Sequence, residues 1–200
     1  MDRDDWDQRY RQKELLWSAE PNRFLVDAVS GLDPGRAYDL AGGEGRNAVW
    51  LAEQGWSVTV VDWSTVALEK GRQLAASRGV GVHFEEADLL DWAPQERVDL
   101  VAVVYLQLPP RERHVVWRAA VDALAAGGTL VVIGHDSSNL EEGYGGPQSP
   151  TVLYTADEVV EVLGDRIEVV KAQRVERPVE TEDGTIRVAV DNVVVGRLAV

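Results

Sequence analysis

Short apolar runs rich in valine alternate with amphipathic stretches along residues 36–134. This alternation is the pattern of repeated β-α-β units, which build a parallel sheet with helices packed against it. We therefore expect an α/β fold with helices on both faces of a mostly parallel sheet. The first five expected strands cover residues 37–41, 57–61, 81–84, 98–106 and 129–134.

The expected helices are bounded by residues that favour helix ends. Ser64 and Thr155 have side-chain oxygens that cap a helix N-terminus, and Glu158 completes a capping box with Thr155. Proline favours the first turn of a helix, and glycine commonly follows the last turn. The expected helices cover residues 46–54, residues 64–78, the stretch between Pro109-Pro110 and Gly127-Gly128, and residues 155–163.

The C-terminal third has a different pattern. Residues 135–150 are polar, rich in glycine and without a sustained period, which predicts a long loop of the kind that covers or lines a binding site. Two alternating segments at residues 167–180 and 186–198 then predict a β-hairpin. Such a hairpin adds two strands to the sheet, one of them antiparallel, and brings the expected total to seven.

Composition sets broad limits on the class of protein. A length of 200 residues, with 45% apolar and 27% charged residues, is typical of one globular domain spanning residues 1–200. The absence of cysteine excludes disulfides, thiolate metal sites and cysteine nucleophiles. A net charge of −14 argues against a nucleic-acid partner, because such binding depends on basic side chains.

No apolar run reaches the roughly 20 residues of a membrane span, and the acidic N-terminus is unlike a signal peptide. We therefore expect a cytoplasmic protein with no membrane partner.

The sequence Asp39-Leu-Ala-Gly-Gly-Glu-Gly45 stands where the first strand meets the first of these helices. Its small residues allow backbone N–H groups to approach a ligand closely, which predicts a nucleotide site at this turn. Asp62 follows Gly43 by 19 residues, a position from which an acid binds ribose hydroxyls. The segment from Gly43 to Ala48 also matches the G-x-G-x-x-G/A fingerprint of dinucleotide-binding proteins. These residues alone are compatible with both kinds of nucleotide cofactor.

Five segments, taken in order, resemble the class I S-adenosylmethionine-dependent methyltransferases, and in particular the small bacterial enzymes of the tellurite-resistance and thiopurine-methyltransferase type. They are Trp6-Asp-Gln-Arg-Tyr10, the glycine-rich turn with Arg46-Asn47, Val61-Asp62-Trp-Ser, Ala87-Asp88-Leu89 and Tyr105-Leu-Gln-Leu-Pro109. The resemblance covers nearly the whole chain and implies a Rossmann-like sheet that ends in an antiparallel hairpin. In the family signature Asp/Glu-x-Gly-x-Gly-x-Gly, Ala41 takes the place of the first glycine, and we expect it to keep φ below zero.

The resemblance implies S-adenosylmethionine as the cofactor and gives roles to individual residues. Asp88 is expected to accept the adenine amino group, with Leu89 against the ring. Tyr10 and Arg46 are candidates for binding the cofactor's carboxylate, under a helical cap formed by residues 1–35. The expected cofactor-binding residues are Tyr10, Asp39, Ala41, Gly43, Gly45, Arg46, Asp62, Trp63, Asp88, Leu89 and Tyr105.

The methyl acceptor is expected to be a polar small molecule, with an oxygen such as a sugar-type hydroxyl as the methylated atom. A hydroxyl must lose a proton, and the pair His135-Asp136 stands at the carboxyl end of the fifth strand, on the side of the sheet that faces a ligand. We therefore expect His135 and Asp136 to be catalytic. Residues 135–153 are expected to form an acceptor-side loop, and the expected substrate-binding side chains are Trp6, Trp17, Gln107 and Tyr144.

Two other functions fit parts of the same pattern. One is an NAD(P)-dependent oxidoreductase that uses Gly43 to Ala48, and the other is a non-catalytic nucleotide-binding module on the same fold. We predict no metal, because Asp136, Glu141 and Glu142 show no repeating ligand spacing. The valine-rich hairpin is compatible with a monomer or a homodimer.

Overall fold

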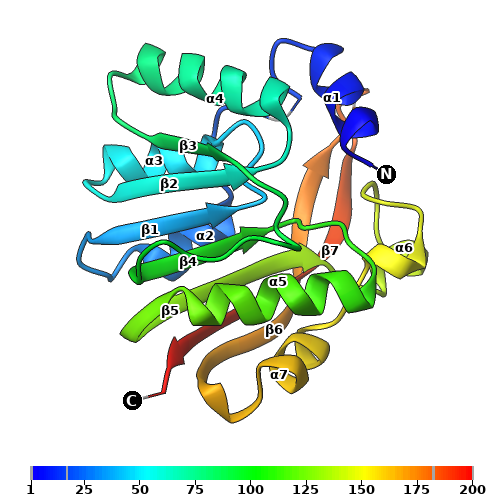
Figure 1. The fold of residues 1–200 in the computed structure, drawn as a ribbon. Helices are drawn as coiled ribbons and strands as arrows, with labels where there is room; N and C mark the ends of the chain where they lie inside the picture. The colour runs from blue at the N-terminus through cyan, green and yellow to red at the C-terminus, as the bar shows by residue number, and fades with distance from the viewer. Residues whose placement is uncertain (1, 17, 182, 200) are drawn as a thin grey trace.

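The structure, a computed structural model, describes residues 2–16, 18–181 and 183–199. At its centre is a seven-stranded sheet with the strand order β3-β2-β1-β4-β5-β7-β6 (Figure 1). The strands are β1 (Arg36–Leu40), β2 (Ser57–Asp62), β3 (His83–Glu86), β4 (Val98–Val104), β5 (Leu124–His135), β6 (Ile167–Glu180) and β7 (Ile186–Leu198). The predicted α/β fold with seven strands is confirmed.

The C-terminal hairpin changes the direction of pairing at one side of the sheet. Strands β1 to β5 pair in parallel, whereas β7 is antiparallel to both β5 and β6. The hairpin therefore inserts β7 between β5 and the edge strand β6, which confirms the predicted antiparallel insertion.

Helices cover both faces of the sheet (Figure 1). The helices are α1 (Arg3–Arg11), α2 (Arg23–Val29), α3 (Arg46–Glu53), α4 (Thr65–Arg78), α5 (Pro110–Asp122), α6 (Asn139–Glu142) and α7 (Ala156–Leu163), with short 3-10 turns η1 (Pro150–Val152) and η2 (Gly164–Arg166). Helices α2, α3 and α4 pack on one face, and α5 and α7 pack on the other. Helix α1 lies beside α4, and α6 lies beside β7. Every helix in the described parts of the chain is too short or too polar to span a membrane.

Alternate residues of the central strands point to the two helical layers. In β4, Leu100 and Ala102 belong to the apolar cluster under α2, α3 and α4, whereas Val101 and Val103 belong to the cluster under α5 and α7. All four side chains are fully buried. A strand that is covered on both faces needs a continuous apolar run, because its side chains alternate between the faces. The valine-rich runs of the sequence are therefore the central strands.

Some expected boundaries are wrong. The third strand begins two residues later than expected, because it pairs in parallel with the end of β2. Strand β4 ends one residue before Tyr105, which has a left-handed φ of 58°. The helix that begins at Pro110 ends at Asp122, because Leu124 is fully buried and already belongs to β5. The loop expected at residues 135–150 contains the short helix α6.

Asp39 lies in β1, beneath the turn that follows this strand. Its side chain is fully buried, and its two oxygens have no well-aligned hydrogen-bond donor among the described residues. Burial raises the pKa of this carboxyl from 3.8 to about 7, and the positive charge of Arg46 opposes part of the increase. The folded chain therefore binds a proton on Asp39 more tightly than the unfolded chain does.

Because folding shifts the pKa of Asp39, the free energy of unfolding should depend on pH. Because folding raises the pKa of Asp39, its stabilising contribution is fully present below pH 3.8 and is lost as the pH rises to about 7. The increase in the pKa of Asp39 corresponds to a contribution of about 4 kcal/mol at most, at about 1.4 kcal/mol per pKa unit. Asp39→Asn, which stays neutral at similar volume, should remove this decline. Urea unfolding of both proteins between about pH 4 and about pH 8 measures the difference. Parallel pH dependences for the two proteins would show that Asp39 does not titrate in this range.

Candidate functional site

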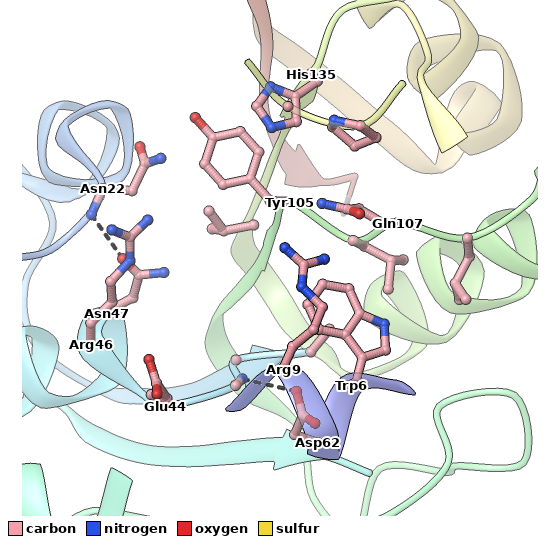
Figure 2. Close-up of a pocket in the computed structure, with 18 of the residues that line it drawn as sticks. Trp6, Arg9, Asn22, Glu44, Arg46, Asn47, Asp62, Tyr105, Gln107 and His135 are labelled. Carbon is pink, nitrogen blue, oxygen red and sulfur yellow. Dashed lines mark hydrogen bonds between the residues drawn. The ribbon is translucent and has the colours of Figure 1, made fainter. Parts of the chain in front are cut away.

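A cavity of about 680 Å³ lies at the carboxyl ends of β1, β2, β4 and β5 (Figure 2). Ligands of α/β proteins bind at this edge of the sheet, because the loops that follow the parallel strands meet there. The cavity is also lined by α1, by residues 87–90 and 144–147, and by residues 177–179 of β6. Its volume is in the range of sites for small molecules.

The glycine-rich turn after β1 bends sharply into α3. Ala41, Gly43 and Gly45 have φ values of 55°, 56° and 68°, in the left-handed region. The expectation that Ala41 keeps φ below zero is therefore wrong. The backbone N–H of Ala41 still donates to Val61 at 2.8 Å, so the chain turns away from β2 at this residue, and a small side chain tolerates the turn. A Cβ atom at Gly43 would lie 2.6 Å from Tyr10 Oη, so a side chain there would have to displace the tyrosine hydroxyl as well as adopt an unfavourable φ.

Asp62 ends β2 beside this turn. Its Oδ2 atom accepts a hydrogen bond from the backbone N–H of Gly43 at 2.9 Å (Figure 2), and its Oδ1 atom accepts one from the backbone N–H of Ser64 at 2.9 Å. The side chain is buried, and burial raises its pKa although these hydrogen bonds oppose the increase. Asp62 thus joins the ends of β1 and β2 and also lines the cavity.

Hydrogen bonds of buried polar groups hold the N-terminal segment over the glycine-rich turn. The carboxylate of Glu44 accepts the backbone N–H of Leu16 at 2.9 and 3.0 Å. Lys70 of α4 donates to the backbone oxygen of Tyr10, and Ser64 donates to Asp7 of α1. These contacts hold α1 so that Trp6, Arg9 and Tyr10 line the cavity.

The loop after β3 supplies another part of the wall. Asp88 and Leu89 both line the cavity, together with Trp63 at the start of the loop after β2. The Oδ1 atom of Asp88 accepts the backbone N–H of Leu90 at 2.9 Å, which fixes the orientation of this exposed carboxylate. The loop therefore presents one carboxylate beside a largely buried leucine.

Arg46 begins α3 and points away from Asp62 toward α2 (Figure 2). Burial lowers the pKa of its guanidinium, while nearby oxygens, including the carboxylate of Asp39, oppose the decrease. Asn22 and Asn47 line the same part of the cavity, and the backbone N–H of Asn22 donates to the side-chain oxygen of Asn47 at 2.9 Å.

The other end of the cavity is organised by a fully buried carboxylate, that of Asp191 in β7. Its Oδ2 atom accepts a hydrogen bond from Tyr105 Oη at 2.8 Å and another from Arg177 Nε at 2.7 Å. His135 Nδ1 lies 3.0 Å from Oδ1, out of line for a straight hydrogen bond. Burial by itself raises the pKa of Asp191, but its contacts with His135 and Arg177 outweigh burial and hold the pKa below its usual value. Tyr105, His135 and Arg177 all line the cavity around this carboxylate.

The loop that covers this end is tied to the hairpin. The side-chain oxygen of Asn139 accepts the backbone N–H of Val190 at 2.7 Å, and the backbone N–H of Tyr144 donates to Val188 at 2.8 Å. A Cβ atom at Gly146 would lie 3.2 Å from the ring of His135, so glycine lets the loop approach the histidine closely.

The structure brings most of the predicted site residues to the cavity. Those that line it are Trp6, Tyr10, Ala41, Gly43, Arg46, Asp62, Trp63, Asp88, Leu89, Tyr105, Gln107, His135 and Tyr144. Asp39 and Gly45 lie behind the turn and do not line the cavity, whereas Trp17 lies outside the described residues. Asp136 is buried away from the cavity, where its Oδ1 atom accepts hydrogen bonds from the N–H and the hydroxyl of Ser138.

Sequence reasoning missed several residues around the cavity, among them Arg9, Asn22, Arg177 and Asp191. A signal for the last of these is present, because Asp191-Asn192 interrupts an apolar run that otherwise continues through β7. Such an interruption is unusual in a strand that is buried on both faces. Among the described residues, no group of three or more His, Asp or Glu side chains is placed to hold a metal ion.

Comparisons with known proteins find similarity to methyltransferases. Residues 37–128 match the model of the methyltransferase domain. The chain is 34% identical over 125 residues to trans-aconitate 2-methyltransferase of Sinorhizobium fredii, an alignment that covers 61% of this chain and 46% of the relative. The chain therefore spans less than half the length of that relative.

Two solved structures share the fold at low sequence identity. TehB from Haemophilus influenzae has a TM-score of 0.75 at 16% identity, covering 98% of this chain and 66% of that chain. The N-methyltransferase NodS from Bradyrhizobium japonicum, in complex with S-adenosyl-L-homocysteine, has a TM-score of 0.74 at 17% identity, covering 98% of this chain and 97% of that chain. Residues 37–128 thus match a methyltransferase domain, and the seven-stranded fold around them is similar to that of a solved methyltransferase with S-adenosyl-L-homocysteine bound.

Proposed function

We propose that this protein transfers a methyl group from S-adenosylmethionine to an oxygen atom of a polar small molecule. The observation that carries the proposal is the continuity of the cavity. Asp62 and Asp88 line one part of it, and Tyr105, His135 and Arg177 line another. Direct transfer requires that cofactor and acceptor share one space. One similar protein is named for a small molecule, trans-aconitate, and this similarity supports a small molecule as the acceptor here.

The residues at the cofactor end fit S-adenosylmethionine. Each oxygen of Asp62 accepts one backbone N–H, which leaves lone pairs for the ribose hydroxyls. Asp88 and Leu89 offer a carboxylate for the adenine amino group and an apolar side chain for the ring. Gly43 brings the backbone of the turn to the cavity wall beside Tyr10. Arg46 offers a guanidinium for the carboxylate of the cofactor.

The residues at the other end fit the removal of a proton from a hydroxyl. When bound, S-adenosylmethionine supplies a methyl group activated by its positively charged sulfur. His135 then takes the acceptor's proton on Nε2, because its Nδ1 faces Asp191. Asp191 stabilises the positive charge that the ring acquires and is a positioning residue. Tyr105 is a poorer base, because burial raises its pKa and its hydroxyl donates to Asp191.

The two alternative functions receive less support. The match of residues 37–128 to a methyltransferase domain argues against a nicotinamide cofactor for the turn at Gly43. A non-catalytic module would be expected to fill the space beyond the cofactor with side chains, whereas this cavity extends to His135 and Gln107. The proposal for Asp191 replaces Asp136, the catalytic partner that the sequence suggested for His135. The carboxylate of Asp191 lies 3.0 Å from the His135 ring, whereas that of Asp136 accepts hydrogen bonds from Ser138.

Cofactor binding is tested by Asp62→Asn. This change removes the charged acceptor for the ribose hydroxyls, so the affinity for S-adenosylhomocysteine should fall about 10- to 100-fold, the effect of losing a hydrogen bond to a charged group. Calorimetry measures the affinity, and NAD(H) is titrated in parallel. Asp91→Asn removes an exposed carboxylate outside the cavity and should leave binding unchanged. If the wild-type protein binds NAD(H) and not S-adenosylhomocysteine, the proposed function is wrong.

The base is tested by His135→Gln. Turnover of a hydroxyl acceptor, found by following S-adenosylhomocysteine release across a metabolite panel, should fall about 10²- to 10⁴-fold. Affinity for S-adenosylhomocysteine should stay the same, because the histidine belongs to the acceptor end. Unchanged turnover in the variant would contradict the assignment of His135 as the base.

The positioning residue is tested by comparing Asp191→Asn with Asp136→Asn. Both changes remove a buried carboxylate near His135, but the one at Asp191 lies within 3.0 Å of the ring. We expect Asp191→Asn to lower turnover at least about tenfold with little change in cofactor affinity, and Asp136→Asn to keep most of the turnover. Thermal unfolding of both variants checks that the comparison is made on folded protein. Equal losses in the two variants would contradict the role of Asp191.

A further inference from the structure

Arginines gather in the cavity of a chain that is strongly acidic overall. The net charge is −14, so most of the surface repels anions. Yet four arginines and three acidic residues line the cavity: Arg9, Arg23, Arg46 and Arg177, with Glu44, Asp62 and Asp88. The cavity is therefore more positive than the chain that surrounds it.

Arg177 is held in a fixed position at the acceptor end. Its Nε atom donates to the buried carboxylate of Asp191 at 2.7 Å, and its guanidinium lies 5.9 Å from the centre of the Tyr105 ring. The side chain remains 25% exposed and lines the cavity. A guanidinium has five N–H donors in one plane, more than Asp191 and the Tyr105 hydroxyl can occupy. The remaining donors are available to a ligand in the cavity.

We propose that Arg177 binds a negatively charged group of the methyl acceptor, a carboxylate or a phosphate, so that the acceptor is an organic anion. Both groups present paired oxygens that match the planar donors of a guanidinium. Arg9 adds positive charge from α1, where its guanidinium lies 4.8 Å from the centre of the Trp6 ring and reaches the space between Trp6 and Gln107 (Figure 2). This inference rests on the proposed function, because it names the class of acceptor for the same site.

The cofactor by itself does not account for this positive charge. S-adenosylmethionine has a single carboxylate, which Arg46 matches, and its positively charged sulfur is repelled by further guanidinium groups. An anionic acceptor is attracted both to Arg177 and to the cofactor's positive charge.

The test measures binding of simple anions to the protein saturated with S-adenosylhomocysteine, by calorimetry at constant ionic strength. The probes are succinate with its neutral counterpart succinamide, and glycerol 3-phosphate with glycerol. We expect at least one anion to bind about tenfold or more tightly than its neutral counterpart. The carboxylate and phosphate pairs show which group the site selects. The proposed function fails if S-adenosylhomocysteine does not bind. The same anion titrations on the protein without S-adenosylhomocysteine then show whether the anion site exists, so failure of this inference can be told from failure of the proposed function.

Substitutions of Arg177 test whether the anion binds at this residue. Arg177→Gln should weaken the preferred anion about tenfold or more while affinity for S-adenosylhomocysteine stays the same. Arg177→Lys keeps the charge without the planar donors and should give an intermediate affinity. Arg174→Gln is the matched control, because it removes the same charge from β6 at an exposed residue that pairs with Glu142 outside the cavity.

Several outcomes would overturn the inference. The first is equal affinity for the charged and neutral probes, and the second is that no anion binds. The third is anion binding that Arg177→Gln leaves intact, and the fourth is anion binding that Arg174→Gln weakens as much as Arg177→Gln does. If Arg177→Gln does not fold, the wild-type preference for anions and the intermediate affinity of Arg177→Lys still decide the question.

Discussion

The parallel pairing of β1 with β2 and β4 is the constraint on which the site depends. Its register aligns Asp39 of β1 with Val60 of β2 and with Ala102 of β4. All three strands therefore end at the same edge of the sheet, and the glycine-rich turn, Asp62 and Tyr105 meet there. The hydrogen bond from the Gly43 N–H to Asp62 then fixes the turn against β2. Residues far apart in the chain become neighbours because strand direction places them there.

The antiparallel strand β7 adds the second half of the cavity. Its pairing sets Asp191 directly opposite His135 of β5 and opposite Val175 of β6, two residues before Arg177. A fully buried carboxylate is costly unless donors surround it. Here Tyr105, His135 and Arg177 surround it, so the same contacts that make the buried charge tolerable also orient three side chains at the cavity wall. The hairpin thus connects the stability of the sheet to the chemistry that we propose.

Parts of this arrangement were predictable because they depend on local patterns. The valine-rich runs predicted the central strands, since a strand that is covered on both faces has apolar residues without interruption. The spacing from Gly43 to Asp62 predicted their meeting, because a β-α-β unit has a nearly constant length. By contrast, the left-handed φ of Ala41 and Tyr105 could not be predicted from residue type, since residues other than glycine rarely adopt it. Both residues stand where a strand turns sharply into the wall of the cavity.

The sequence by itself determined the fold class, the seven strands and the meeting of the glycine-rich turn with Asp62, because periodicity, capping residues and motif spacing are local properties. Only the tertiary structure decided the partner of His135. Asp136 is its neighbour along the chain, but successive residues of an extended chain point to opposite sides. The carboxylate beside the ring comes instead from Asp191, which lies 56 positions further along and is brought there by pairing between β5 and β7. Contacts across a sheet depend on strand order and register, which a linear pattern does not contain.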